Sequence, residues 1–286
     1  MKKVATVAAL RQSRLSWVGE TVAFVPTMGN LHEGHLTLVD RARQEADRVI
    51  ASIFVNPTQF GPSEDFASYP RTLEADLEKL ASRGCDLTFV PAQEELYPRG
   101  IDAFTTVDVP AVGNGLCDAS RPGHFRGVAS VVTRLLNAVS PDIAVFGQKD
   151  YQQLKTMERM VAELLLPVSL VAAPIARESS GLAMSSRNGY LLDAQKQQAG
   201  ALYRTLEQLR DDLTEGDQSW TEQRDVALSR LRQAGLEPEY LELRHPQTLD
   251  LPTPGQAEAW VLLAAVRLGA TRLIDNLVLP TPVNVR

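Results

Sequence analysis

Hydrophobic and polar positions alternate along this chain in blocks that predict strands separated by helices. A short apolar run over residues 21–26 predicts one strand. The continuous run over residues 49–55 is typical of a strand that is buried on both faces of a parallel sheet. Between the two runs, Leu36, Val39 and Ala42 recur at helical spacing and predict a helix over about residues 35–46 with one face in the core. The pattern therefore favours an α/β fold.

The alternation of strands and helices continues to about residue 172. A helix is predicted after Thr72, which is expected to be its N-cap, and the carboxylates Glu74, Asp76 and Glu78 are expected mostly on a solvated face. The other elements predicted here are strands over 86–90, 142–146 and 168–172, helices over 128–139 and up to about 165, and a strand-like piece at 107–109 within a long loop over 91–126.

The composition of the chain changes after residue 188. Residues 174–188 have the pattern of a mobile loop, and long amphipathic helices are predicted beyond it over about 194–213 and 221–234. Strands are predicted near residues 240–243, 259–266 and 272–276. We therefore expect one domain over residues 1–175 and a smaller α+β domain over residues 176–286.

Composition narrows the class of protein. The chain has 286 residues, of which 44% are hydrophobic and 22% charged, as in ordinary soluble globular proteins. A net charge of -6 argues against nonspecific binding to nucleic acid or to an acidic membrane. Cys85 and Cys117 are too few for a disulfide framework, so buried thiols in a reducing setting are expected. The N-terminal apolar stretch is too short and polar for a signal peptide or membrane span, and we expect a cytoplasmic protein.

Candidate chemistry begins with two histidines, His32 and His35, at the predicted start of the first helix. The first backbone N–H groups of a helix have no partner within it, so a helix start favours anions. Gly34 between the histidines allows a ligand to approach the backbone closely. The predicted function of this stretch is to bind a phosphate chain, and the alternative is a pair of solvated histidines.

Polar residues also follow the next strand, in a loop over residues 56–62. The carboxyl ends of parallel strands are where open α/β sheets bind ligands. The side-chain amides of Asn56 and Gln59 offer donors and acceptors for a polar substrate, whereas Asn56 before Pro57 equally fits a simple turn.

Three further groups carry charge or hydroxyls near predicted turns. Arg121, His124 and Arg126 suit either a carboxylate or phosphate, or a hydrogen-bonded turn. Lys149 follows the strand over 142–146 and would direct its ammonium group at phosphates, with Gln153 four residues later on the same helix face. The last group, Ser185, Ser186 and Arg187, suits phosphate oxygens but is weak evidence alone.

The order of these motifs resembles a known family. The elements His32-Glu33-Gly34-His35 and Met184-Ser185-Ser186-Arg187 resemble the HxGH and KMSKS-like motifs of the nucleotidyltransferase superfamily, which includes class I aminoacyl-tRNA synthetases. With the stretches 24–29, 54–60, 69–71, 121–125, 146–154 and 184–188, the chain is similar to the pantothenate synthetase (pantoate-β-alanine ligase) family.

The resemblance implies a reaction and a site. Pantoate and ATP would form pantoyl-adenylate and pyrophosphate, and the amine of β-alanine would then attack to give pantothenate and AMP. It also implies Mg²⁺, a Rossmann-like N-terminal domain, a smaller C-terminal domain acting as a lid, and a homodimer. Gln59 and Gln153 would hold pantoate, and Gln59 would also contact β-alanine. The residues expected to contact ATP are Met28, Gly29, Asn30, Leu31, His32, Glu33, Gly34, His35, Gly147, Gln148, Lys149, Asp150, Ala176, Met184, Ser185, Ser186 and Arg187.

Catalytic roles are implied for His35, His32, Lys149 and Arg187, with His35 the usual proton donor of the family. The third motif lacks the lysines of KMSKS, so Arg187 and Lys149 would supply that charge. No protein ligands for Mg²⁺ can be assigned from the sequence. Another HxGH nucleotidyltransferase, or a module that binds a nucleotide without turnover, remain alternatives, whereas an acidic chain of this length does not fit an aminoacyl-tRNA synthetase.

Overall fold

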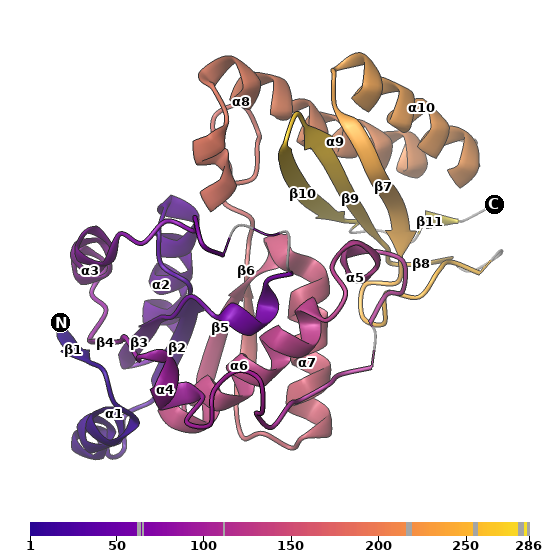
Figure 1. Cartoon of the computed structure of the whole chain (residues 1–286). Coiled ribbons are helices and arrows are strands. Elements are labelled where there is room, and N and C mark those ends of the chain that lie inside the picture. Colours follow the sequence, from indigo (N-terminus) through magenta and orange to yellow (C-terminus); the bar gives the residue numbers. More distant parts are fainter. Residues whose placement is uncertain are drawn as a thin grey trace. The chain divides into compact units, whose positions relative to one another are not determined.

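Two compact units make up the chain in the computed structural model, which describes residues 1–61, 64, 66–110, 112–215, 219–253, 257–279 and 283–284 (Figure 1). Unit 1 is formed by residues 1–111, 117–148 and 153–174, and unit 2 by residues 112–116, 149–152 and 175–286. The domains 1–175 and 176–286 stay a prediction. Pro62, the last residue of the predicted loop after the second strand, lies outside the described residues.

Unit 1 is built on a parallel sheet with the strand order β1-β4-β3-β2-β5-β6. This confirms the predicted Rossmann-like fold. The central strands are mainly apolar because helices cover both of their faces. The strands are β1 (Lys2–Val4), β2 (Val22–Thr27), β3 (Arg48–Ile53), β4 (Leu87–Phe89), β5 (Ile143–Gly147) and β6 (Ser169–Ala173).

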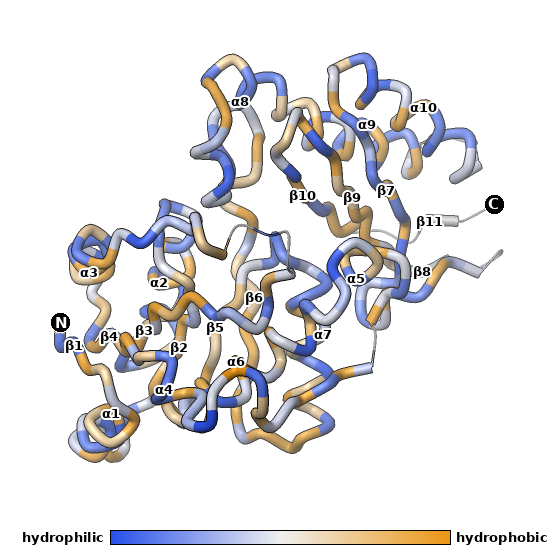
Figure 2. Tube along the Cα trace, in the orientation of Figure 1, coloured by the Kyte–Doolittle hydropathy of each residue, from blue (hydrophilic) through white to orange (hydrophobic). Residues whose placement is uncertain are grey.

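Helices pack apolar side chains against each face of this sheet. Figure 2 shows that the central strands consist largely of hydrophobic residues. On one face, α2 (Glu33–Glu45) and α3 (Leu73–Ser82) cover Val25 and Ala51, and Leu36, Val39 and Ala42 of α2 are buried as predicted. On the other face lie α1 (Val7–Arg14), α6 (His124–Val139) and most of α7 (Tyr151–Glu163).

The region before α6 differs from the prediction. Residues 107–109 form no strand, because the Val107 N–H donates to the hydroxyl of Ser130 on α6 (2.9 Å) instead of to a neighbouring strand. Two short helices, α4 (Gln93–Leu96) and α5 (Cys117–Ser120), lie in the stretch that was expected to be loop. α6 also begins four residues earlier than predicted, directly after Gly123 with its φ of 79°.

Unit 2 contains a three-stranded antiparallel sheet in the order β10-β9-β7. Its strands are β7 (Glu237–Arg244), β9 (Val261–Leu268) and β10 (Thr271–Val278), and a short pair is formed by β8 (Ala257–Glu258) and β11 (Val283–Asn284). One face of the sheet packs on α9 (Ala201–Glu215) and α10 (Trp220–Gln233), and the other contacts Val112, Leu116 and Tyr151. The smaller α+β part is therefore confirmed.

The first long helix predicted for this unit is divided into α8 (Asp193–Ala199) and α9 at Gly200. A Cβ atom at Gly200 would lie 2.2 Å from the backbone oxygen of Ser180, so only glycine allows the two segments to approach. The predicted mobile loop over 174–188 contains an antiparallel bridge between Arg177 and Ala183. Its mobility stays a prediction.

The two thiols differ in their surroundings. Cys85 is buried, and burial raises the pKa of its thiol to about 11. Cys117 is only half-buried, so the expectation of two buried thiols is wrong for this residue, which lies on the short helix α5. Over the described ranges of the chain, every helix is too short or too polar to cross a lipid bilayer.

Candidate active site

Three loops of unit 1 meet at the carboxyl ends of β3, β2 and β5. β2 pairs with β3 on one side and with β5 on the other, and the chain order reverses between β2 and β5. Ligands of open α/β sheets bind at such a switch point. The loop Met28–His32 follows β2, the segment Phe54–Gln59 follows β3, and Gln148 follows β5. The sheet topology therefore places the predicted residues of these three segments along one edge of the sheet.

The turn after β2 has a left-handed backbone at two successive residues. Gly29 has a φ of 80° and Asn30 a φ of 50°. A Cβ atom at Gly29 would lie 3.1 Å from both Asp76 and Ile53, so a side chain there would crowd these residues as well as strain the backbone. Asn tolerates the left-handed region better than most residues. This turn brings the chain from β2 directly into α2.

Asp76 of α3 holds this turn, which corrects the expectation of a solvated carboxylate. Its side chain is 1% exposed, and its two oxygens accept the backbone N–H groups of Asn30 and Leu31, both at 2.8 Å. Thr72 does not cap α3 with its side chain but donates to Asp76 (3.1 Å). Lys79, one turn further on, donates to the carbonyl of Leu31 (2.7 Å). Glu74 and Glu78 are exposed, as expected.

The two histidines cap the start of α2 with their own rings. His32 Nδ1 accepts the N–H of Gly34 (3.1 Å), and His35 Nδ1 accepts the N–H of His32 (3.3 Å). Their ring centroids are 4.0 Å apart. A neutral imidazole that accepts through Nδ1 carries its proton on Nε2, so both rings offer an Nε2–H donor. This pair is the chemically distinctive feature of unit 1.

The capping changes one sequence expectation. The N–H groups of Leu31, His32 and Gly34 already donate within the protein, so the expectation of unpartnered N–H groups is wrong at these positions. The positive end of the helix dipole remains at this terminus, where it favours negative charge. Glu33 lies at the helix start and pairs with Arg83 (2.6 Å).

Asn56 and Gln59 have different roles in the segment after β3. Asn56 is 1% exposed; its Oδ1 accepts the hydroxyl of Tyr97 (2.8 Å), and its Nδ2 donates to the carbonyl of Gly127 (3.3 Å). Of the two predicted roles for Asn56, the structure therefore favours the turn residue. The Asn56 amide also donates to Gln59 Oε1 (3.0 Å), and Gln59 Nε2 donates to the sulfur of Met28 (3.3 Å). Gln59 is thereby oriented beside the turn that follows β2.

The basic cluster before α6 is mainly structural. Arg121 makes a two-pronged ion pair with Glu64 (2.7 and 2.6 Å) and approaches His124 (3.0 Å). The ring of His124 bonds the carbonyl of Gln59 (2.8 Å), so the cluster supports the segment that carries Gln59. This favours the hydrogen-bonded turn over the anion site for Arg121 and His124. Arg126 is exposed.

The remaining predicted residues are divided between the units. Gly147, Gln148 and Gln153 belong to unit 1, where Gln153 is half-buried on α7. Lys149 and Asp150, whose charged groups are 3.7 Å apart, belong to unit 2. Unit 2 also contains Ala176, Met184, Ser185, Ser186 and Arg187.

Backbone contacts shape the third motif in unit 2. The N–H of Met184 donates to the carbonyl of Ala176 (2.9 Å), which closes a hairpin with its tip at residues 178–182. Ser185 caps the short helix Ser186–Tyr190 by accepting the N–H of Arg187 (3.2 Å). The buried Asn188 ties both arms together through Glu178 (2.7 Å) and the Ala183 carbonyl (3.1 Å).

Metal binding by protein groups alone finds no support in the described ranges of the chain, which contain no cluster of three His, Cys, Asp or Glu side chains suited to a metal ion. Mg²⁺ in proteins is commonly bound by one or two carboxylates together with substrate phosphates.

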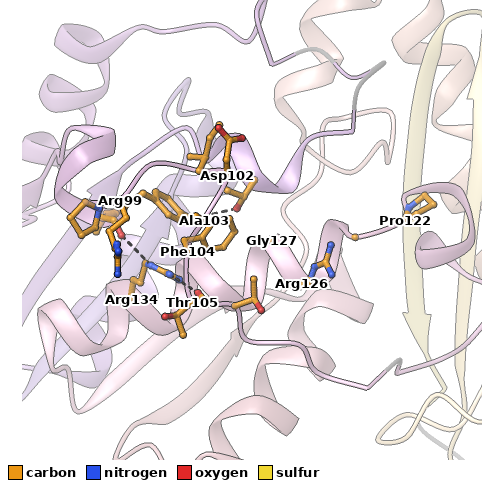
Figure 3. A pocket seen from close by; sticks show the side chains of 16 residues that line it. Arg99, Asp102, Ala103, Phe104, Thr105, Pro122, Arg126, Gly127 and Arg134 are labelled. Atoms are coloured by element: carbon orange, nitrogen blue, oxygen red, sulfur yellow. Dashed lines mark hydrogen bonds between the residues drawn. The ribbon is translucent and has the colours of Figure 1, made fainter.

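A cavity of about 980 Å³ lies elsewhere in unit 1, beside the loop 97–106 and the start of α6 (Figure 3). Its Arg134 stacks on Tyr97 and Phe104, and it donates to the carbonyls of Leu96 (3.1 Å) and Thr105 (2.6 Å). Arg134 therefore fixes the loop. None of the described residues predicted to bind ATP or pantoate lines this cavity, so we place the candidate site at the switch point.

Comparison with known proteins decides the family. The model of a family described as pantoate-beta-alanine ligase matches residues 2–278. The chain belongs to the pantoate-beta-alanine ligase family. It is an enzyme of that family.

Relatives agree over nearly the whole length. The chain is 57% identical to a pantothenate synthetase of Chromohalobacter salexigens over 91% of this chain and 92% of the relative. It is 52% identical to one of Pseudomonas aeruginosa over 97% and 98%. A crystal structure of pantothenate synthetase from Thermus thermophilus superposes with a TM-score of 0.88 at 45% identity, covering 97% of this chain and 99% of that one.

A further solved relative carries ligands. It is a pantoate-beta-alanine ligase from Francisella tularensis complexed with beta-gamma ATP and beta-alanine, with a TM-score of 0.80, 32% identity and 98% coverage of both chains. That protein binds both molecules in one crystal. Sequence reasoning missed the support that Asp76 gives to the turn after β2, because its only signal was a carboxylate near a helix start.

Proposed function

We propose that this enzyme joins pantoate to β-alanine with the consumption of ATP, through a pantoyl-adenylate. Membership of the family supports the overall reaction. The observation that carries the proposal is the pair of imidazoles at the start of α2, which lies next to the segment with Gln59. Donors fixed in this way are suited to a phosphate group that gains charge during reaction.

The first step needs charge stabilisation and no general base. Pantoate's carboxylate is ionised at neutral pH, and one of its oxygens attacks the α-phosphorus of ATP while the bond to the pyrophosphate oxygen breaks. We assign the Nε2–H groups of His32 and His35 to the phosphate oxygens, with His35 as the main donor. Lys149 and Arg187 neutralise the leaving pyrophosphate, and each well-placed donor of this kind is typically worth about 3–4 kcal/mol.

Pantoate is held by side-chain amides. Gln59 is already oriented by Asn56 and Met28. The Gln153 side chain is half-buried and makes no hydrogen bond with the described part of the chain, so its donor and acceptor are available to a hydroxyl or carboxylate. We propose that these two glutamines bind pantoate and that Gln59 also contacts β-alanine.

The second step forms the amide. The neutral amine of β-alanine attacks the acyl carbon of the adenylate, the bond from that carbon to the phosphate oxygen breaks, and AMP leaves. The ammonium form dominates at neutral pH, so one proton must be lost before attack and a second afterwards. We propose that solvent and the departing phosphate receive them.

The nucleotide contacts are proposed to extend over Met28 to His35, Gly147 to Asp150, the backbone of Ala176, and Met184 to Arg187. Magnesium is proposed to enter as part of the ATP substrate, with phosphate oxygens among its ligands. We also propose a cytoplasmic homodimer, and sedimentation of the purified chain tests the dimer directly.

The test of the proposed function is AMP release in the presence of ATP, Mg²⁺, pantoate and a panel of amines. We expect AMP and pantothenate to form in equal amounts, and only when β-alanine is present. AMP release that does not depend on β-alanine would contradict the ligase and favour another HxGH nucleotidyltransferase. ATP binding without any turnover would favour a nucleotide-binding module.

A further inference from the structure

Two neighbouring residues of β10, Asp275 and Asn276, each bond one of the two cationic segments of unit 2. Both side chains are buried, at 3% and 2% exposure. Successive residues of a strand face opposite sides of a sheet. Asp275 lies opposite Ala264, which packs toward α9, and Asn276 lies opposite Leu263, which packs toward Val112 and Tyr151. One dipeptide thus reaches both faces of the small sheet.

On the first face, Asp275 holds the hairpin that leads into Met184. Its two oxygens accept both terminal nitrogens of Arg177, at 2.6 and 2.9 Å. The guanidinium of Arg177 also lies 3.5 Å from the ring centroid of Tyr203 and donates to the carbonyl of Gly181 (3.0 Å). Because Arg177 pairs with Ala183 across the hairpin, this clamp fixes the strand that enters Met184–Arg187.

On the second face, Asn276 holds the segment that contains Lys149. Its amide Nδ2 donates to the carbonyl oxygen of Lys149 (3.0 Å). The N–H of Asn276 donates to Asp275 Oδ1 (2.8 Å), which links the two contacts. Tyr151, two residues after Lys149, donates through its hydroxyl to the carbonyl of Pro246 (3.0 Å). The backbone of the Lys149 segment is therefore fixed to the same unit as the hairpin.

We infer that Asp275 and Asn276 are positioning residues that set the placement of Lys149 relative to Arg187 for the phosphates of ATP. A triphosphate presents several charged oxygens at fixed spacing, so two cations serve it only if their backbones are held at a matching distance. This inference rests on the proposed function. Gln59 and Gln153 belong to unit 1, so pantoate binding should not depend on this dipeptide.

The test compares Asn276→Ala and Asp275→Asn with two control variants on the same faces. Ile274→Ala removes an apolar side chain on the face of Asn276, and Leu273→Ala removes one on the face of Asp275. Pyrophosphate exchange gives kcat and KM for ATP and for pantoate, circular dichroism gives the folded fraction, and calorimetry gives the Kd of a nonhydrolysable ATP analogue. If Asp275→Asn does not fold, Arg177→Lys tests the same contact between residues 177 and 275. This variant keeps the positive charge but loses the two-pronged geometry.

We expect kcat/KM for ATP, per folded molecule, to fall about tenfold or more in the two test variants. This is the decrease that the loss of one charge-assisted hydrogen bond produces. KM for pantoate should stay within about twofold of wild type, and both controls should keep wild-type ATP parameters. Equal ATP parameters in test and control variants would overturn the inference. A wild-type chain without pantoate-dependent exchange would contradict the proposed function instead, and the Kd of the ATP analogue would then decide the positioning role.

Discussion

The helices α2 and α10 begin with the same reciprocal arrangement, in which the residue before the helix and the residue three positions later each accept a backbone N–H. In α10, Ser219 Oγ accepts the N–H of Glu222 (3.3 Å) and Glu222 accepts that of Ser219 (3.0 Å). In α2, imidazole nitrogens of His32 and His35 perform these tasks. Histidine is not among the preferred N-cap residues, whereas serine is.

The difference between these helix starts shows what the histidines add. The hydroxyl and carboxylate of α10 bond each other as well (2.9 Å), so their polar groups serve the cap itself. Each imidazole uses only Nδ1 for the cap, and the ring carries a second nitrogen on its far side. The start of α2 thus departs from the usual preference for serine, threonine, aspartate or asparagine at the N-cap. Such departures are typical of functional sites.

The largest expected effect comes from removing the second histidine. His35→Ala should lower the rate of adenylation about 10²–10³-fold with the fold intact, because one fixed phosphate donor is lost. Lys149→Ala is expected to act similarly. Pantoate-dependent pyrophosphate exchange measures the rate. The matched change Glu222→Ala in α10 should leave it at the wild-type value, and near-normal turnover of His35→Ala would remove this residue from the mechanism.

Replacing His32 by a better capping residue separates the cap from the chemistry. Asn is a preferred N-cap, so His32→Asn should change the free energy of unfolding by less than about 1 kcal/mol. Adenylation should nevertheless fall about tenfold to a hundredfold because an imidazole donor is gone. Denaturant unfolding and exchange rates test both parts. Ser219→Asn is the control, and equal activity in the two variants would contradict the assignment.

Asp76 tests the support beneath α2. Asp76→Ala leaves the N–H groups of Asn30 and Leu31 without their buried acceptor, which should cost about 1–3 kcal/mol of stability. Adenylation should fall about tenfold, since small displacements of a catalytic group are costly. Glu74→Ala, an exposed carboxylate on the same helix, is the control. Wild-type rates in Asp76→Ala would show that the turn holds its shape without this residue.

The smallest expected effect is on the pKa of Glu222 in the cap of α10. Hydrogen bonds from the backbone and hydroxyl of Ser219 lower the pKa of Glu222 below its ordinary value of 4.5. Because the folded-state pKa is depressed, the contribution to stability is present above the unfolded pKa and is lost as pH falls through the folded pKa. In an NMR titration, Ser219→Ala should raise the midpoint of Glu222. An unchanged midpoint would contradict the capping contact.

The sequence predicted elements whose signals are local. The apolar runs over 21–26 and 49–55 became β2 and β3, and the periodic Leu36, Val39 and Ala42 became the buried face of α2. The candidate residues after β2 and β3 follow from the same patterns, because the carboxyl ends of parallel strands lie along one edge of the sheet.

Long-range support could not be predicted. Asp76 lies 46 residues from Asn30, and Asp275 lies 98 residues from Arg177, so neither pairing has a local signature. The burial of Asp76 could not be predicted either, because the sequence pattern of α3 places Asp76 and Glu74 on the same solvated face. The hydrogen bond from Asn276 to Lys149 crosses 127 residues and likewise depends on the folded chain.

Pyrophosphate exchange into ATP, with Mg²⁺ and pantoate but without β-alanine, tests the central claim most directly. The adenylate mechanism predicts exchange that is confined to pantoate within a panel of carboxylic acids, since the first step is then complete and reversible before the amine binds. ATP that binds measurably but shows no exchange with pantoate would contradict the mechanism.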